Sequence, residues 1–404
     1  MSKAPSNIDR ISDPSGGANQ TRVRAYNERL VLSLVRRHGH LPKSDIARRS
    51  GLSAQTVSVI MRSLEADGLL LRREPVRGKV GQPSIPMALN PEGAYSFGMK
   101  IGRRSAEMVL INFLGNRIAS IRKTYPYPLP HDLLAFAIEA IKELSAKIDK
   151  KDLPKIAGIG IGIPFQLWMW AEKVGAPHGS MDLWQGFDIS KELEEKTGLH
   201  SFTQNDATAA CGAELTFGRG AEFADFVYFF IGTFAGGGIV LNHSIYSGRT
   251  GNAGALGSLP IKEHGSTGQL LDHASIYDLE KMLIKEGKDP AILRDTLSDW
   301  SELGDTLSQW IECASDYIAM AIVASSSVID FEAAIIDGAI PRNILEILIQ
   351  KTIAKTDKLD LQGIILPTIL PGTVGNGARA LGAATLPLFN RYLLDQNVLF
   401  KAMG

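Results

Sequence analysis

The chain has 404 residues, of which 45% are hydrophobic and 21% charged, so it is long enough for two or three domains with large buried cores. It has no apolar run of the roughly 18–20 residues that span a bilayer, no apolar signal-peptide core in its first 20 residues, and only two, distant cysteines. These features exclude a membrane-spanning protein and a disulfide framework, and we expect a cytoplasmic protein.

The net charge of zero hides an uneven distribution. Residues 1–90 contain 15 Lys and Arg against 7 Asp and Glu, whereas the other 314 residues contain 28 against 36. A basic end joined to a mildly acidic body predicts a module that binds a polyanion such as DNA. A solvated basic face without a partner is the alternative.

Residues 1–22 are rich in Ser, Gly, Asn and Pro and have no periodicity, so we expect a disordered lead-in. Residues 23–90 follow a different pattern. Apolar residues at helical spacing predict one helix from Arg24 to Gly39 and a shorter one over 42–49. Gly51 then allows a turn, and Ser53 is placed to cap a third helix over 54–67.

The third helix has the composition of a DNA recognition helix. Its apolar residues lie on one face, and small polar residues lie near its amino end, which suits a helix that enters the major groove. The following segment, "LLLRREPVRGKVGQPSIP", is typical of the wing of a winged helix-turn-helix. A three-helix scaffold without DNA would also explain the apolar face, but not this basic segment. The predicted DNA-binding residues are Gln55, Thr56, Ser58 and Arg62 on the helix and Arg77, Lys79 and Gln82 on the wing.

From residue 91 short apolar strands alternate with helices, which predicts an α/β body. The strands expected are 96–101, 107–113, 156–163, 226–232, 236–242 and 333–337. The helices expected are 131–149, 189–197, 206–217, 275–287 and 302–328.

Four segments of the body are distinctive in their order: "GIGIGIP" at 158–164, "QNDATAACGAEL" at 204–215, "IGTFAGGGIVLNHSIYSGRTGNAGALGS" at 231–258 and "GARALGAA" at 377–384. Behind a winged helix they resemble the ROK family, which joins sugar kinases and sugar-responsive repressors on a two-lobed, actin-like ATPase fold. The resemblance implies this fold for residues 91–404. The smaller lobe would comprise about 91–205 with a carboxy-terminal helix near 386–400, and the larger lobe about 206–385.

The resemblance also identifies groups that kinases of the family need. The general-base Asp and its Asn neighbour match Asp206 and Asn205, and the second phosphate loop matches "GTFAGGG". The first loop departs from the pattern Asp-x-Gly-Gly-Thr, because its positions are Lys100, Gly102, Arg103 and Arg104. A lysine in place of the acid reverses the charge where magnesium nucleotide would bind, so we expect no kinase activity, no catalytic residues and no cofactor.

The family's zinc and sugar sites are altered as well. Positions that hold zinc on one His and three Cys are here Ser258, Lys262, His264 and Gln269, so the resemblance implies no metal site. Two sugar-binding glutamates become Ala255 and Leu271, with Asp272 able to replace the second only after a register shift.

The expected effector is a sugar or a sugar-derived molecule, and its predicted binding residues are Asn205, Asp206, Trp168 and Trp184. Tryptophan is more common in cores than on sugars, which leaves a structural role open for Trp168 and Trp184. Arg103 and Arg104 either meet a phosphorylated effector or are solvated turn residues.

The sequence therefore predicts a homodimeric or homotetrameric repressor of carbohydrate-related genes that binds an inverted-repeat operator in double-stranded DNA and contacts no membrane. Two other functions stay open: an active sugar kinase with a DNA-binding module, and a DNA-binding dimer without an effector.

Overall fold

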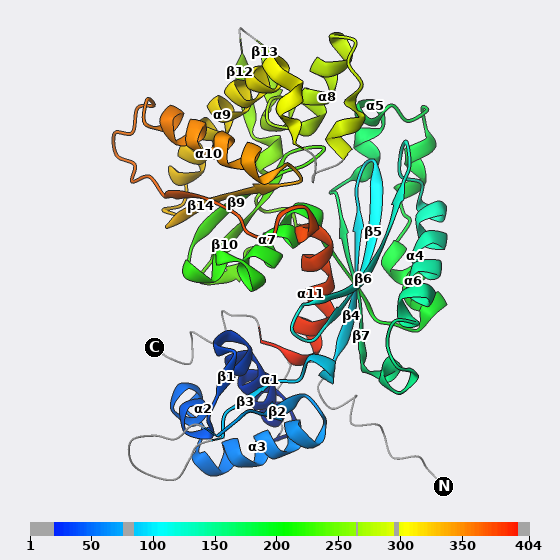
Figure 1. Ribbon diagram of the computed structural model, residues 1–404, viewed down its shortest axis with the longest axis vertical. Helices are drawn as coiled ribbons and strands as arrows, with labels where there is room; N and C mark the ends of the chain where they lie inside the picture. Colours follow the sequence, from blue (N-terminus) through cyan, green and yellow to red (C-terminus); the bar gives the residue numbers. More distant parts are fainter. Residues whose placement is uncertain (1–19, 76–84, 264–265, 295–298, 395–404) are drawn as a thin grey trace.

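The computed structural model of the protein describes residues 20–75, 85–263, 266–294 and 299–394. These residues form a small amino-terminal domain below two α/β lobes (Figure 1). No helix in the described ranges combines the length and the apolar character needed to cross a bilayer.

The amino-terminal domain contains three helices and a three-stranded sheet of order β1-β3-β2. Ser53 caps α3 by accepting a hydrogen bond from the Thr56 N–H, and Gly51 before it has a φ of 70°, so both predicted roles are confirmed. The antiparallel pair β2–β3 forms the base of a wing. The elements are α1 (Gln20–His38), β1 (His40–Leu41), α2 (Lys43–Ser50), α3 (Ala54–Ala66), β2 (Leu70–Arg72) and β3 (Met87–Leu89).

The first lobe is built on a sheet of order β6-β5-β4-β7-β8. Strands β4, β5 and β6 are antiparallel, and β4, β7 and β8 are parallel. Its elements are β4 (Tyr95–Ile101), β5 (Ser105–Asn112), β6 (Arg117–Thr124), α4 (Pro130–Ser145), β7 (Ile156–Ile163), α5 (Ala171–Val174), α6 (Ile189–Thr197) and β8 (Ser201–Asn205).

The second lobe repeats this plan with a sheet of order β11-β10-β9-β14-β15. Helix α7 covers one face of β9, and helices α9 and α10 pack toward the other. Its elements are α7 (Asp206–Phe217), β9 (Phe226–Ile231), β10 (Gly236–Leu241), β11 (Ser244–Ile245), β12 (Pro260–Glu263), β13 (Ser266–Gln269), α8 (Ile276–Lys285), α9 (Gly304–Ser326), β14 (Ala333–Gly338), α10 (Arg342–Thr356) and β15 (Thr368–Pro371).

The two sheets share one strand order and one pattern of directions, because in each a hairpin of the first two strands is followed by two parallel strands. The turn of the first hairpin, residues 102–104, therefore corresponds to residues 232–235 in the second. Both turns reach the space between the lobes, where they contribute side chains to one cavity.

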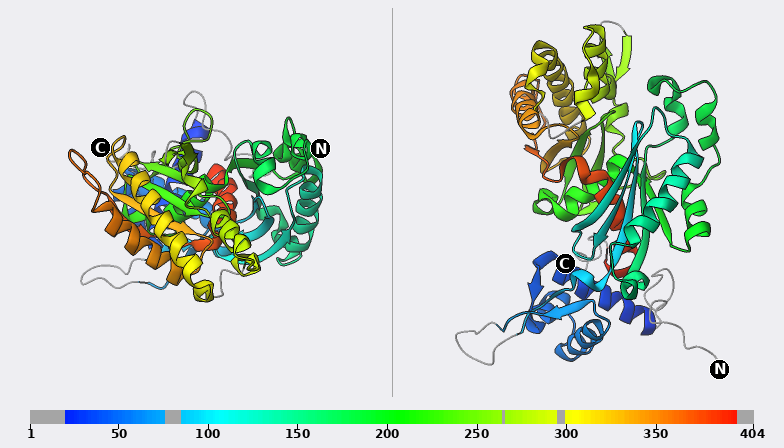
Figure 2. Two further views of the ribbon diagram at one scale, coloured as in Figure 1. Left: turned by 90° about the horizontal axis from the view of Figure 1, so that it is seen from above. Right: turned by 45° about the vertical axis from the view of Figure 1, so that its right-hand side comes forward.

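Helix α11 (Ala378–Tyr392) lies between the lobes and points toward the amino-terminal domain (Figures 1 and 2). Its packing is close enough to require glycine at several contacts. A Cβ on Gly160 of β7 would lie 1.7 Å from the Ala383 carbonyl oxygen, and one on Gly382 would lie 1.7 Å from that of Ala209 in α7. These distances explain Gly160 of "GIGIGIP" and Gly382 of "GARALGAA" as packing positions.

The carboxy-terminal end of α11 is bonded to α1. Arg29 donates hydrogen bonds to the carbonyl oxygens of Phe389 and Leu393, and Ser33 accepts one from the Leu394 N–H. The Arg36 guanidinium lies over the ring of Phe389, 5.2 Å from its centre. One apolar cluster runs from the core of the amino-terminal domain into β5 and α11, so the domain is packed against the body as well as tethered to it.

Most expected strands and helices are present, but the carboxy-terminal helix is displaced from its predicted position near 386–400 to 378–392. Helix α10 was not predicted. Residues 395–404 and most of the predicted lead-in at 1–22 lie outside the described residues.

Candidate functional site

The exposed face of α3 carries Gln55 and Arg62, with Ser58 partly exposed between them. The Thr56 hydroxyl is hydrogen-bonded to Ser53 at 2.8 Å, so it stabilises the helix start in addition to any contact with DNA. Val59 lies on the same face and is 48% exposed. An exposed apolar side chain beside Gln55 suits contact with a thymine methyl group, and the sequence prediction omitted it.

The wing is described only at its base. Arg72 of β2 donates to Glu65 of α3 at 2.6 Å, which ties the wing to the recognition helix. The remaining predicted DNA contacts, Arg77, Lys79 and Gln82, lie outside the described residues.

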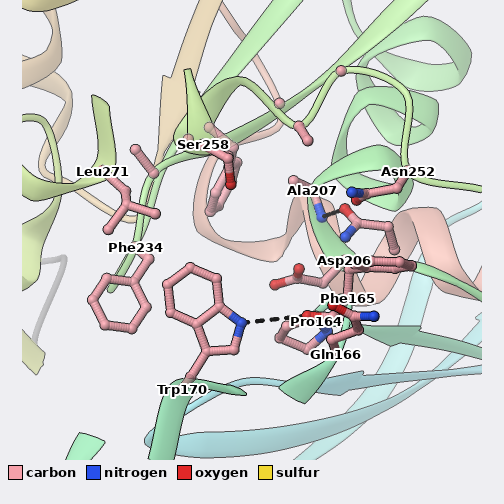
Figure 3. A pocket seen from close by; sticks show the side chains of 18 of the residues that line it. Pro164, Phe165, Gln166, Trp170, Asp206, Ala207, Phe234, Asn252, Ser258 and Leu271 are labelled. Atoms are coloured by element: carbon pink, nitrogen blue, oxygen red, sulfur yellow. Dashed lines mark hydrogen bonds between the residues drawn. The ribbon is translucent and has the colours of Figure 1, made fainter. Parts of the chain in front are cut away.

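A cavity of about 440 Å³ lies between the two lobes (Figure 3). Asp206 enters it from the start of α7, and Trp170 and Phe234 form an aromatic wall (Figure 3). Ala255 and Leu271, which the resemblance matches to sugar-binding glutamates, both line it. The cavity therefore has apolar side chains where the resemblance implies carboxylates.

Asn205 and Asp206 are brought together at the end of β8. The Asn205 side-chain oxygen accepts hydrogen bonds from the backbone N–H groups of Ala207 and Thr208 and so caps α7. The Asp206 carboxylate is buried, and Arg379 of α11 donates to it across 3.4 Å. This buried ion pair couples α11 to the cavity, and Arg379 was not among the predicted site residues.

Arg103 projects from the first hairpin turn and lies against two aromatic rings. Its guanidinium carbon lies 4.6 Å from the ring centre of Trp170 in the first lobe and 4.4 Å from that of Phe234 in the second. Burial lowers the pKa of Arg103 to about 10, so the side chain is charged at neutral pH. Arg103 is thus neither a solvated turn residue nor remote from the cavity.

Lys100 is buried on the face of β4 that also carries Gly98, toward α11. Its ammonium group donates to the Ser105 hydroxyl at 2.8 Å and to the Ser105 carbonyl oxygen at 3.1 Å. Burial and then the nearby Arg379 hold its pKa well below the usual value. Lys100 lines a second cavity of about 460 Å³ together with Arg104, whose guanidinium lies 3.8 Å from Glu280.

Kinases of the family hold a magnesium ion with the nucleotide and a zinc ion beside the sugar, and the residues at these two positions do not fit either ion. A magnesium ion needs oxygen ligands, whereas the position of the family's acid is filled by the Lys100 ammonium group. Three of the family's zinc positions supply a hydroxyl, an ammonium and an amide at Ser258, Lys262 and Gln269, and these cannot make a thiolate site. The fourth, His264, lies outside the described residues. The described residues contain no cluster of three His, Cys, Asp or Glu that could hold a metal. Neither metal fits.

Trp168 and Trp184 line a different cavity from Asp206, although Asn205 borders both. Trp184 is 4% exposed, and its indole N–H donates to the Pro128 carbonyl oxygen at 3.0 Å. The structure therefore places Trp184 in the core, which is the alternative that the sequence left open. Trp170, two residues after Trp168, is the tryptophan that lines the cavity with Asp206.

The family model "ROK family" matches residues 96–388, and a model for a winged helix-turn-helix DNA-binding domain matches residues 24–70. The chain belongs to the ROK family. Among curated relatives, a putative xylose repressor of a Caldicellulosiruptor species is 25% identical over 292 residues, covering 70% of this chain and 72% of that protein. The xylose repressor of Bacillus subtilis is 23% identical over 270 residues, covering 66% and 69%.

Solved structures of the ROK family share the fold. A ROK family transcriptional regulator, a homologue of the Escherichia coli MLC protein, matches with a TM-score of 0.67 at 19% identity and covers 94% of this chain and 98% of its own. A ROK family glucokinase from Streptomyces griseus, in complex with glucose and AMPPNP, matches with a TM-score of 0.58 at 18% identity, covering 72% and 99%. The regulator match extends over the amino-terminal domain as well as the two lobes, so the predicted fold class is confirmed.

Proposed function

We propose that this ROK protein is a sequence-specific transcriptional repressor that senses a sugar or sugar-derived ligand between its lobes and does not transfer phosphate. The main support is the position of α11. This helix begins at the Asp206–Arg379 ion pair in the cavity, and its carboxy-terminal end is hydrogen-bonded to Arg29 of α1. Fifteen helical residues at 1.5 Å each span about 22 Å, so one continuous helix joins the ligand site to the DNA-binding domain.

Ligand binding can act through this helix. Arg103 on the first lobe contacts Phe234 on the second, so the cavity wall changes when the lobes move relative to each other. A ligand that binds one lobe arrangement more tightly shifts the population toward it. In a two-fold dimer, movement of α11 would then change the position of α1 and α3 relative to the recognition helix of the partner subunit. A cytoplasmic location is part of this proposal, because the operator that the protein would bind is there.

The repressor names of the curated relatives support a function in sugar-dependent repression, and the residues of the first turn argue against catalysis. Lys100 and Arg103 fill the places where a kinase would hold magnesium and phosphate. The Asp206 and Asn205 pair and the second glycine loop favour the kinase alternative. An ATP-dependent phosphorylation assay over a panel of monosaccharides decides between them, and turnover above the level of an Asp206→Ala control would refute the proposal.

The proposal itself is tested with DNA selected from a random duplex pool by the full-length protein. An inverted repeat is the expected product, because a two-fold dimer presents two copies of α3. Light scattering then gives the number of subunits on this DNA. Sugars, sugar acids and sugar phosphates are titrated into the complex, and at least one is expected to change its affinity. If none of these compounds changes the affinity of the protein for the DNA, the result would favour a DNA-binding dimer without an effector.

A further inference from the structure

Three cationic side chains line the cavity between the lobes, and two of them have acidic partners. Lys173 is paired with Asp272 at 2.6 Å, and Arg379 with Asp206 at 3.4 Å. Arg103 has no ion-pair partner among the residues that the structure describes. With Asp272, which lies outside the lining, counted as the partner of Lys173, one positive charge is in excess among these described residues.

The surroundings of Arg103 decide how a ligand can reach it. Trp170 and Phe234 pack against each other with ring centres 5.3 Å apart, and the Arg103 guanidinium group lies against both rings. Donors of a guanidinium lie in its plane, so an acceptor must approach along the edge. A flat carboxylate can accept two parallel hydrogen bonds in that plane.

Unused hydrogen-bond donors mark the same place. The buried Nε atoms of Arg103 and Arg379 have no hydrogen-bond partner among the described residues, and Arg379 as a whole is only 8% exposed. A buried donor without an acceptor costs about 1–3 kcal/mol. Both arginines line the same cavity.

The charge excess also distinguishes between classes of ligand. A neutral sugar leaves the Arg103 charge without a counter-charge in an apolar wall formed with Phe234, Ala255 and Leu271. A phosphate monoester carries a charge of about −1.5 to −2 at pH 7, which is larger than the single excess positive charge of Arg103. A single carboxylate matches it.

We propose that the ligand of this cavity is a sugar acid whose single carboxylate is bound by Arg103. The inference rests on the proposed function, because it specifies the class of effector. The hydroxyl groups of such a ligand lie within the part of the cavity formed by Asn205 and Asp206, and its ring faces the aromatic wall of Trp170 and Phe234 (Figure 3).

The test uses full-length protein and matched ligands that differ at one carbon. Glucose, glucuronate and glucose 6-phosphate form one set, and the galactose and mannose series form two more. Titration calorimetry gives the dissociation constant of each, and thermal unfolding gives the shift in Tm. We expect at least one sugar acid to bind about tenfold or more tightly than its neutral parent, as expected for a hydrogen-bonded charge.

Two variants assign this preference to Arg103. Arg103→Gln is expected to remove it, whereas Arg103→Lys, which keeps the charge but loses the planar fork, retains part of it and guards against a folding defect in the first variant. Arg104→Gln is the matched control, because this neighbouring arginine lines the other cavity and is paired with Glu280. The control is expected to keep the full preference.

The possible failures are distinct. If neutral sugars bind and release DNA while the acids do not, or if the preference for acids survives in Arg103→Gln, the carboxylate inference is wrong and the proposed function stands. Tighter binding of the phosphates would likewise overturn the carboxylate assignment. If no sugar of any class binds or alters the DNA complex, the proposed function fails together with the inference.

Discussion

The junction between α11 and α1 makes a prediction that needs no knowledge of the ligand. Arg29 donates to two backbone carbonyl oxygens at the end of α11, both at 2.9 Å. Hydrogen bonds to a charged group contribute about 1.5–3 kcal/mol each, and partial exposure of the side chain reduces this. We therefore expect Arg29→Ala to weaken docking of the amino-terminal domain by roughly 2–4 kcal/mol.

The distribution of tryptophan provides the assay. All five tryptophans lie between residues 168 and 310, so tryptophan fluorescence reports on the body and not on the amino-terminal domain. Far-ultraviolet circular dichroism reports on helices in both. In urea the wild type is expected to show coincident transitions by the two probes, because one apolar cluster spans the junction.

In Arg29→Ala, helical signal is expected to be lost at lower urea than the fluorescence change, since the amino-terminal domain then unfolds first. Arg22→Ala is the control, because Arg22 is an exposed arginine on the same helix. Coincident transitions in Arg29→Ala, with a free energy of unfolding within about 0.5 kcal/mol of the wild type, would refute the proposed role of the junction.

Three further predictions concern other parts of the molecule. Gln55→Ala is expected to weaken binding to the selected operator by about 1–3 kcal/mol in fluorescence anisotropy, with unchanged affinity for random DNA. Gly160→Ala places a Cβ against the Ala383 carbonyl and should cost about 1–3 kcal/mol in urea unfolding, whereas Gly212→Ala, with open space around it in α7, should be neutral or stabilising. Burial raises the pKa of Asp337 to about 6, so its contribution to stability is present below about pH 4 and lost as the pH rises to about 6. Asp337→Asn should remove this loss, on the order of 3 kcal/mol, and an unchanged pH profile of unfolding would contradict the assignment.

The elements that the sequence predicted well are those set by local patterns. Helix α3 begins where Ser53 can cap it, and the strands β7 and β9 follow runs of apolar residues. Helix α11 was misplaced because glycine disfavours helix by propensity, and Gly382 lies in its middle. Close packing against α7 overrides that preference, and packing between residues far apart in the chain cannot be read from a local pattern.

The same limit applies to the cavity. Asp206 was identifiable from its place after a strand and from the family motif, but its partner Arg379 lies 173 positions away. Trp168 and Trp170 are separated by a single residue on a short 3-10 turn, where no alternation rule decides which side chain reaches the cavity. Arg103 was noticed as a departure from the motif, and its contact with two rings became visible only in three dimensions.

The two hairpin turns show how a protein with the fold of a kinase can sense a ligand. Each lobe supplies a turn to the space between the lobes, and in a kinase both turns would serve the phosphates of a nucleotide. Here the first turn carries Arg103 and the second carries Phe234, and the two side chains contact each other instead. A contact between the lobes that a ligand can strengthen or replace is sufficient to bias their arrangement, and α11 lies between the lobes from the cavity to α1. In the proposed repressor without phosphate transfer, the two lobes and α11 are kept, and these are the parts that carry a movement from the cavity to α1.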